Sequence, residues 1–391
     1  MRQTQSRARP SLLRELNTRQ VLTAIQARGP LSRAEITRFT GISGPTVTRT
    51  VSALIEANLL EEGEFRPSVL GRPGRVVSLA TRNVAVLGAV VTPTRCDVLA
   101  AGLDGVVHGE HLHSFATPAT YAELVKTIAQ HARQVISDER KTILGLGISV
   151  PGLLDRRDQR TVISPNLHQT DGKKLGEDLA GELERETVIL QESHALCLAE
   201  RTYGAAKDVA DFAMLDITGG LGLGVVHGGR QLEGHSGLAG ELGHITVELN
   251  GKRCGCGNTG CLETVASDTA LEDLLTQKLG RPVTIEEIVA SGQAGTLDAE
   301  PELERVLQYL AVGLAVVINV FNPQKIFIFG RFLDADSRLF PRLLDLTRQR
   351  ALAPSMADCE IIRAQGNKRL GAIAGIIHRL TGMSDENGGE R

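Results

Sequence analysis

The pattern of apolar positions predicts three helices near the amino terminus. Val21, Leu22 and Ile25 recur at helical spacing in residues 17–28, and Gly29-Pro30 ends that helix. Ser32 and Glu35 have the spacing of a capping box, which predicts a short second helix that ends near Gly41. We expect Ser43 to cap a third helix, with an apolar face formed by Val47, Val51, Leu54 and Ile55. Three helices with a glycine turn before the third predict a helix-turn-helix motif.

In such a motif the start of the third helix enters the major groove of DNA. Small or polar residues occupy that position here, and we expect the DNA contacts to come from Ser43, Gly44, Thr46, Thr48 and Arg49. A turn-rich segment, Gly71-Arg72-Pro73-Gly74-Arg75, precedes a β-like run and predicts the wing of a winged helix. Arg72 and Arg75 would then suit insertion into a narrow minor groove. The alternatives are a plain helical bundle with polar faces and, at the wing, a solvated hairpin tip.

Residues 81–391 alternate between β-like and helical patterns. The β-like runs cover residues 84–91, 142–150, 212–217 and 325–329, and the helical patterns cover residues 121–138, 193–203 and 303–320. This alternation predicts an α/β architecture. Residues 216–224 have the pattern of a strand, a glycine loop and a second strand. Such a loop can present backbone N–H groups to a phosphate, or can serve as a plain hairpin turn.

Charge divides the chain at the same place. Residues 1–80 hold 12 arginines, no lysine and six glutamates, a balance of +6, whereas the remainder holds 31 basic and 40 acidic residues. A basic head joined to an acidic body predicts an anionic partner, with double-stranded DNA the leading candidate. No apolar run approaches the ~20 residues that span a bilayer, and the first residues lack the apolar core of a signal peptide. We therefore expect a cytoplasmic protein without a membrane partner.

A histidine and three clustered cysteines have the composition of a structural zinc site. Cys254, Cys256 and Cys261 follow His244 in a glycine-rich stretch. Three thiolates and one imidazole complete the closed tetrahedron that structural zinc adopts. We expect one structural zinc ion per chain; the alternative is three reduced cysteines in a loop without metal. Glu241 and Glu263 bracket the cluster, so we expect the metal to hold a polar pocket in shape rather than to act in catalysis.

The order of these motifs carries a family resemblance. The glycine loop is followed by Gly234, by Gly-Glu-Leu-Gly-His at residues 240–244 and by the cysteine cluster, and further matches are Ser-Pro-Asn-Leu at residues 164–167, Asn322-Pro323 and Gly371-Ala372. The chain thus resembles the ROK family of repressors, open reading frames and kinases, in its repressor branch with a winged helix-turn-helix, over nearly its whole length. The resemblance implies a two-lobed, actin-like α/β body. A head over residues 1–80 would precede lobe one, over residues 81–200 plus 371–391, and lobe two, over residues 201–370, with the zinc site and the oligomerisation surface.

The resemblance also assigns roles to residues. His244, Cys254, Cys256 and Cys261 would be the zinc ligands. Glu241, His244 and Glu263 fall where the family contacts sugar hydroxyls, and Asn166 lies in a stretch that lines the same cleft. Alternatively, the cleft is vestigial or His244 serves zinc alone.

Two motifs depart from those of the family's kinases, which hold phosphate with an Asp-x-Gly-Gly-Thr loop and place Asn-Asp before a helix. The first position of the loop is Val90, and Thr92-Pro93 replaces the glycine pair, so that one N–H is lost at the proline. Gln191-Glu192 replaces Asn-Asp, and each side chain is one methylene longer, which misplaces a base that needs close geometry. In addition, Gly330 is followed by Arg331 where the nucleotide lobe often has another glycine. We expect no enzyme activity, and we place Gln191 and Glu192 in a reshaped sugar pocket.

Together these observations predict a sequence-specific DNA-binding regulator, a repressor of carbohydrate-metabolism genes, with a sugar or sugar derivative as effector. Paired heads predict a homodimer or homotetramer on a palindromic operator. Two alternatives remain: a sugar kinase with an accessory DNA-binding head, and a constitutive DNA-binding protein with an inactive pocket.

Overall fold

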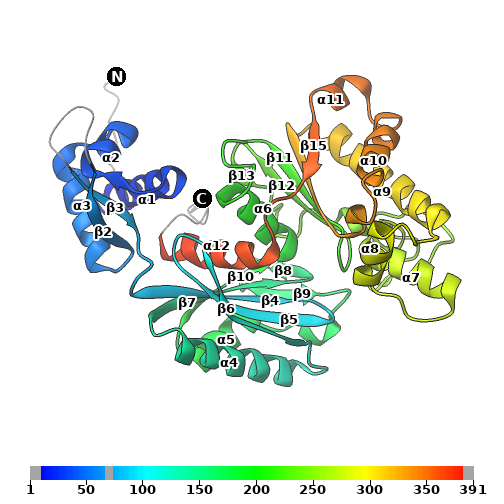
Figure 1. Ribbon diagram of the computed structural model, residues 1–391, viewed down its shortest axis with the longest axis horizontal. Helices are drawn as coiled ribbons and strands as arrows, with labels where there is room; N and C mark the ends of the chain where they lie inside the picture. The colour runs from blue at the N-terminus through cyan, green and yellow to red at the C-terminus, as the bar shows by residue number, and fades with distance from the viewer. Residues whose placement is uncertain (1–9, 67–73, 156, 382–391) are drawn as a thin grey trace, which may run out of the picture.

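The computed structural model describes residues 10–66, 74–155 and 157–381. A small head lies at one end of the molecule, and a larger body contains two five-stranded sheets with a pair of helices between them (Figure 1). The mixed α/β architecture predicted from the sequence is confirmed.

The head contains the three predicted helices, α1 (Pro10–Arg28), α2 (Arg33–Thr40) and α3 (Gly44–Glu56). Helix α1 begins well before residue 17, where the prediction placed its start. The prediction missed the first turns because it depended on apolar periodicity, and Leu13 and Leu16 are exposed and interrupt that periodicity. Both hydrogen bonds of the predicted capping box open α2 at Ser32. Ser43 occupies the N-cap position of α3, but its hydroxyl donates to Thr46 Oγ1 at 2.9 Å and caps no backbone group, contrary to our expectation.

A small antiparallel sheet completes the head. Its order is β1-β3-β2, formed by β1 (Leu31–Ser32), β2 (Leu60–Arg66) and β3 (Gly74–Leu79). Strands β2 and β3 pair antiparallel as the hairpin of a wing, and residues 67–73 of the sequence lie outside the described residues. The winged helix predicted from the sequence is therefore present.

The two sheets of the body have the same topology. The first has the order β10-β7-β4-β5-β6 and the second the order β13-β12-β11-β14-β15. In each, three successive strands pair antiparallel and two later strands add in parallel on the other side. The first sheet comprises β4 (Val84–Val91), β5 (Arg95–Ala101), β6 (Val107–Ala116), β7 (Thr142–Val150) and β10 (Glu186–Gln191); the second comprises β11 (Phe212–Asp216), β12 (Gly222–His227), β13 (Arg230–Gln231), β14 (Lys325–Phe329) and β15 (Glu360–Arg363).

Helices cover both sheets. In the first lobe, α4 (Tyr121–Asp138) and α5 (Leu175–Leu183) pack on one face of the sheet, and a small hairpin, β8 (Leu153–Asp155) and β9 (Arg160–Ile163), follows β7. In the second lobe, the helices are α7 (Asp268–Leu279), α8 (Ile285–Gln293), α9 (Glu300–Phe321), α10 (Leu339–Arg348) and α11 (Ala353–Ala357). By length and hydropathy α9 could cross a membrane, but its apolar side chains, from Leu303 to Ile318, form the buried core of the second lobe. We interpret α9 as a core helix.

Two helices lie between the sheets: α6 (Glu192–Thr202) and α12 (Lys368–Leu380). Helix α12 packs on β7 and β4 of the first sheet, and α6 packs on α12 and on β11 and β12 of the second. The two helices approach closely, since a Cβ added at Gly371 would lie 2.2 Å from the Ala195 carbonyl oxygen. Side chains from α12 (Ile373, Ile376 and Ile377) also belong to the same buried cluster as the apolar core of the head. Helix α12 therefore links the two lobes and the head.

Candidate DNA-binding head and interlobe site

The first turn of α3 presents the predicted DNA-contacting residues to solvent. Ser43, Gly44, Thr48 and Arg49 are exposed, and Thr46 is half-buried. Val47, Val51 and Leu54 on the opposite face are buried, which fixes this orientation. The Thr48 hydroxyl donates to the Gly44 carbonyl oxygen at 3.0 Å and keeps its acceptor capacity. An exposed helix start with small and polar side chains can approach both phosphates and base edges.

The two predicted wing arginines have different outcomes. Arg72 lies outside the described residues. Arg75 lies within the described residues, and its guanidinium forms an ion pair with the Glu62 carboxylate at 2.9 Å. Arg33 forms a second ion pair with the same carboxylate at 2.7 Å. These contacts, led by the Arg75 hydrogen bond, lower the pKa of Glu62. Arg75 thus has a protein partner at the base of the wing.

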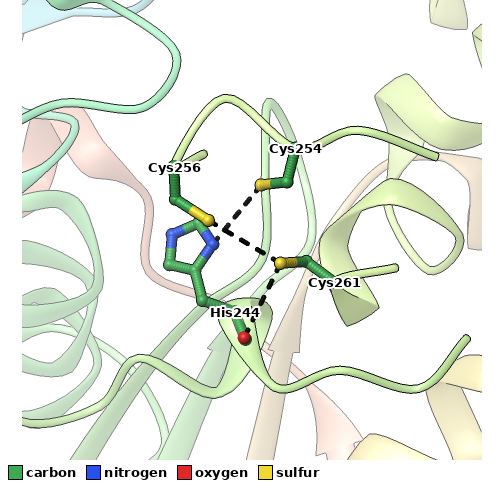
Figure 2. A group of neighbouring side chains, drawn as sticks. All are labelled: His244, Cys254, Cys256 and Cys261. Atoms are coloured by element: carbon green, nitrogen blue, oxygen red, sulfur yellow. Dashed lines mark hydrogen bonds between the residues drawn. The ribbon is translucent and has the colours of Figure 1, made fainter. Parts of the chain in front are cut away.

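The four predicted metal ligands converge in the second lobe (Figure 2). The ligand atoms of His244, Cys254, Cys256 and Cys261 all lie within 4.8 Å of one another. His244 ends the short 3₁₀ turn η2 (Leu242–His244), and Cys261 directly precedes a second one, η3 (Leu262–Thr264). An antiparallel bridge between Thr246 and Cys261 joins the two segments. Gly260 has a φ of 73°, and a Cβ there would lie 1.6 Å from the Glu248 carbonyl oxygen, so the knot requires glycine at this position.

Two distances between ligand atoms in this cluster match the edges of a zinc tetrahedron. Cys256 Sγ lies 3.7 Å from Cys261 Sγ, and Cys254 Sγ lies 3.6 Å from His244 Nδ1. Ligands at the usual zinc–sulfur and zinc–nitrogen lengths would be separated by about 3.5–3.8 Å in tetrahedral geometry. Burial raises the pKa of the Cys254 and Cys261 thiols, so a cation is needed to hold them as thiolates. Neutral imidazole and three such thiolates fit zinc and no harder metal.

The other nitrogen of His244 faces a run of polar side chains. His244 Nε2 lies 3.6 Å from Glu241 Oε2, and Glu241 Oε1 accepts a hydrogen bond from Gln191 Nε2 at 3.1 Å. On the metal side, Glu263 Oε1 is 3.6 Å from His244 Nδ1 and accepts from Cys254 Sγ at 2.9 Å. Burial raises the pKa of Glu241, although the Gln191 amide and His244 oppose this effect.

Asn166 and the glycine loop complete this group. A Cβ added at Gly220 would lie 2.7 Å from Glu263 Oε2 and 2.8 Å from Asn166 Nδ2, so both side chains approach the loop. A Cβ at Gly255 would lie 2.1 Å from the Pro165 carbonyl oxygen, which brings the cysteine knot against the first-lobe segment that carries Asn166. We call Asn166, Gln191, Glu241, His244 and Glu263 the interlobe cluster.

Several polar atoms beside the interlobe cluster are buried without a hydrogen-bond partner among the described residues. They are Gln191 Oε1, Ser193 Oγ and Ser149 Oγ. Gln191 and Ser149 lie at the carboxyl ends of the paired strands β10 and β7, the edge at which open α/β sheets bind ligands. An unpaired buried polar atom costs about 1–3 kcal/mol, so this site favours a polar ligand. The two surface depressions identified, of about 500 and 730 Å³, are lined by other residues.

Glu192, the residue after Gln191, is paired with a lysine. Its Oε1 accepts from Lys368 Nζ at 2.6 Å, and Lys368 also contacts Asp216 at 2.8 Å. Sequence reasoning missed Lys368, because a lysine at the start of a helix carries no motif that distinguishes it from a surface residue.

The segment predicted to stand in place of a phosphate loop, residues 90–94, forms a closed turn. Between β4 and β5 the Thr92 N–H donates to the Arg95 carbonyl oxygen at 2.9 Å, and the Thr92 hydroxyl donates to the same oxygen at 2.8 Å. Pro93 has no N–H, and its ring packs toward Gly219 of the glycine loop. Neither residue 92 nor residue 93 retains a free backbone donor for phosphate.

Comparisons with known proteins agree with this architecture. The ROK family model matches residues 94–377, and the MarR family model matches residues 16–67. The DNA-binding transcriptional dual regulator NagC of Escherichia coli K12 is 30% identical over 93% of this chain and 92% of its own length. The xylose repressor of Bacillus spizizenii is 28% identical over 85% of this chain and 90% of its length.

A solved structure extends the likeness to both parts of the molecule. The crystal structure of a ROK family transcriptional regulator, a homolog of the E. coli MLC protein, superposes with a TM-score of 0.79 at 26% identity. It covers 94% of this chain and 97% of its own. With two sheets of equal topology, a cysteine–histidine knot and a MarR-type winged helix, this chain belongs to the ROK family.

Proposed function

We propose that this protein is a sequence-specific DNA-binding transcriptional regulator, a repressor of carbohydrate-metabolism genes that acts in the cytoplasm. The observation that carries the proposal is the exposed first turn of α3 on a basic head, whose core shares a buried cluster with α12 between the two lobes. The names of the relatives, which are regulators of transcription, support the same function.

A sugar or sugar derivative is the effector we propose for the interlobe cluster. Two carboxylates, an imidazole and two amides can together bond several vicinal hydroxyls, and buried groups left unpaired discriminate against other ligands. The orphaned Gln191 Oε1 supports a ligand with a hydroxyl donor. One structural zinc ion, held by His244, Cys254, Cys256 and Cys261, would keep Glu263 and His244 in place.

The kinase alternative is less well supported. The turn at Thr92-Pro93 is closed on itself, and the Glu192 carboxylate is paired with the Lys368 ammonium group. We therefore propose that the protein is not an enzyme. We further propose the division into residues 1–80, 81–200 plus 371–391, and 201–370, with the second lobe forming a homodimer or homotetramer; α6 packs on both lobes and would act at their boundary.

The test is a footprint on the DNA that flanks the protein's own gene, repeated across simple sugars and sugar phosphates. We expect a palindromic protected site whose occupancy changes with one sugar. Glu241→Gln should weaken that sugar response. The control variant Glu182→Gln, which changes an exposed residue of α5, should keep the response. Protection that no sugar alters would instead support a constitutive DNA-binding protein. Sugar-dependent ATP turnover would support the alternative that the protein is a sugar kinase.

A further inference from the structure

Lys368 is a buried cation with three protein partners. Its side chain is 9% exposed, and Nζ lies 2.6 Å from Glu192 Oε1, 2.8 Å from Asp216 Oδ2 and 2.9 Å from Thr218 Oγ1. A lysine ammonium has three N–H donors, so all three are used. Burial alone would lower the pKa of Lys368, but the carboxylates of Asp216 and Glu192 outweigh it and raise that pKa. The ammonium therefore remains charged.

Lys368 occupies a helix position at which a positive charge is unfavourable. Lys368 is the first residue of α12, where the helix dipole disfavours a positive charge. Asn367 caps the helix through the Leu370 N–H and gives no compensation for that charge. A residue placed against its local preference and then fully paired indicates a role beyond folding of the helix.

The partners of Lys368 come from both sides of the molecule. Helix α12 packs on the first sheet, whereas Asp216 ends β11 in the second sheet and Thr218 opens the glycine loop. Glu192 begins α6, between the two. The ammonium therefore lies at the start of the glycine loop, whose backbone could otherwise receive a phosphate.

The far half of α12 packs on the first sheet, whose buried side chains continue into the core of the head. Ile373, Ile376 and Ile377 share a buried cluster with Val21, Leu22 and Ile25 of α1. Arg19 of α1 also contributes to lowering the pKa of His378 on α12. Helix α12 thus has its first residue between the lobes and its apolar face on the first sheet, in a buried cluster that is continuous with the core of the head.

We propose that Lys368 is an internal cation that clasps the two lobes together in the place of a nucleotide, and that α12 transmits the state of this clasp to the head. Lobe geometry in this chain would then be set by the protein's own charges, and an effector could change it without any nucleotide. The coupling has a physical carrier, because Lys368 and the buried cluster that extends into the head belong to the same helix.

The first experiment compares Lys368→Met with Arg369→Met in the full-length protein. Arg369 is the next residue on α12, and its ion pair with Asp97 at 2.7 Å stays within the first lobe, so it is a matched control. Hydrogen exchange measured by mass spectrometry should show at least about tenfold faster exchange over residues 212–222 and 192–197 in Lys368→Met. Arg369→Met should leave both segments unchanged. Equal exchange in the two variants would overturn the clasp.

Lys368→Met leaves two buried carboxylates unpaired and could fail to fold. The triple variant Lys368→Met, Glu192→Gln, Asp216→Asn removes the three charges together and keeps the side-chain volumes close to native. We expect it to fold and still to exchange faster in the same two segments. Wild-type protection in the folded triple variant would show that the charges do not hold the lobes.

The second readout is the affinity for the operator, and it rests on the proposed function. The triple variant should change that affinity at least about fivefold, whereas Arg369→Met should not. Unchanged affinity would refute transmission through α12. Absence of operator binding by the wild-type protein would instead refute the proposed function. The hydrogen-exchange result would still show whether Lys368 holds the two lobes together.

Discussion

At the scale of single residues, the two ring nitrogens of His244 face different groups. Nδ1 faces Cys254 and Glu263, and Nε2 faces Glu241. A metal bound at Nδ1 would fix the ring and its tautomer, so that Nε2 would point at the interlobe cluster as a donor. The metal would therefore act on ligand recognition through orientation alone.

The first prediction concerns this metal. The purified protein should contain one zinc per chain by elemental analysis, and Cys256→Ser should lose most of it and unfold at lower temperature, because a structural metal contributes directly to folding. Cys359→Ser removes a buried thiol outside the cluster and should keep the zinc. Wild-type protein that is fully folded without metal would refute the assignment.

At the scale of elements, α3 owes its orientation to burial of one face. Val47, Val51 and Leu54 anchor it to the head, and Thr48 and Arg49 remain exposed. Arg75 at the wing already pairs with Glu62, which leaves Arg49 as the described arginine most clearly presented at the recognition surface.

Arg49→Ala should therefore reduce affinity for the operator by about tenfold or more, as loss of an arginine contact to DNA costs about 1–3 kcal/mol. A binding titration at several salt concentrations would also show a shallower slope if Arg49 contacts phosphate. Arg133→Ala is the control, since Arg133 pairs with Glu182 in the body. Equal affinity of the Arg49 variant and the wild type would exclude α3 as the recognition helix.

At the scale of the whole molecule, stability depends on the two helices between the sheets. Each carries a partly buried histidine: burial lowers the pKa of His194 on α6 to about 4, and burial with Arg201 and Arg19 lowers the pKa of His378 on α12 to about 3. These rings stay neutral in the folded protein at pH 5, whereas an unfolded histidine is protonated below about pH 6.5. Acid therefore favours the unfolded chain.

The sign follows from proton linkage. Stability due to these histidines is present above pH 6.5 and is lost as the pH falls, by about 2 kcal/mol for each at pH 5. In His378→Leu, the fall in the free energy of unfolding between pH 7.5 and pH 5 should be smaller by about that amount, measured by urea denaturation with zinc present. His168→Gln, an exposed histidine, should keep the full dependence. The same dependence in all three proteins would contradict burial of a neutral His378.

Local features could be predicted from the sequence, and features that need distant contacts could not. The limits of β4, β7 and β14 coincide with the predicted runs, because these strands are almost continuously apolar. The four metal ligands lie within 18 positions of the chain, so their spacing was enough to suggest a site. Lys368 contacts Glu192 and Asp216 only after two sheets and two helices have packed together. No local sequence pattern predicts these contacts.

The repeated topology of the two sheets bears on how the chain could acquire its specialised parts. In the first copy the crossover from β6 to β7 spans residues 117–141, and in the second the equivalent crossover from β13 to β14 spans residues 232–324. Because the entropy of loop closure grows only with the logarithm of length, a crossover about four times longer costs only about 1 kcal/mol more. A duplicated half-domain could thus accept a metal knot and three helices at one connection while both sheets kept their pairing.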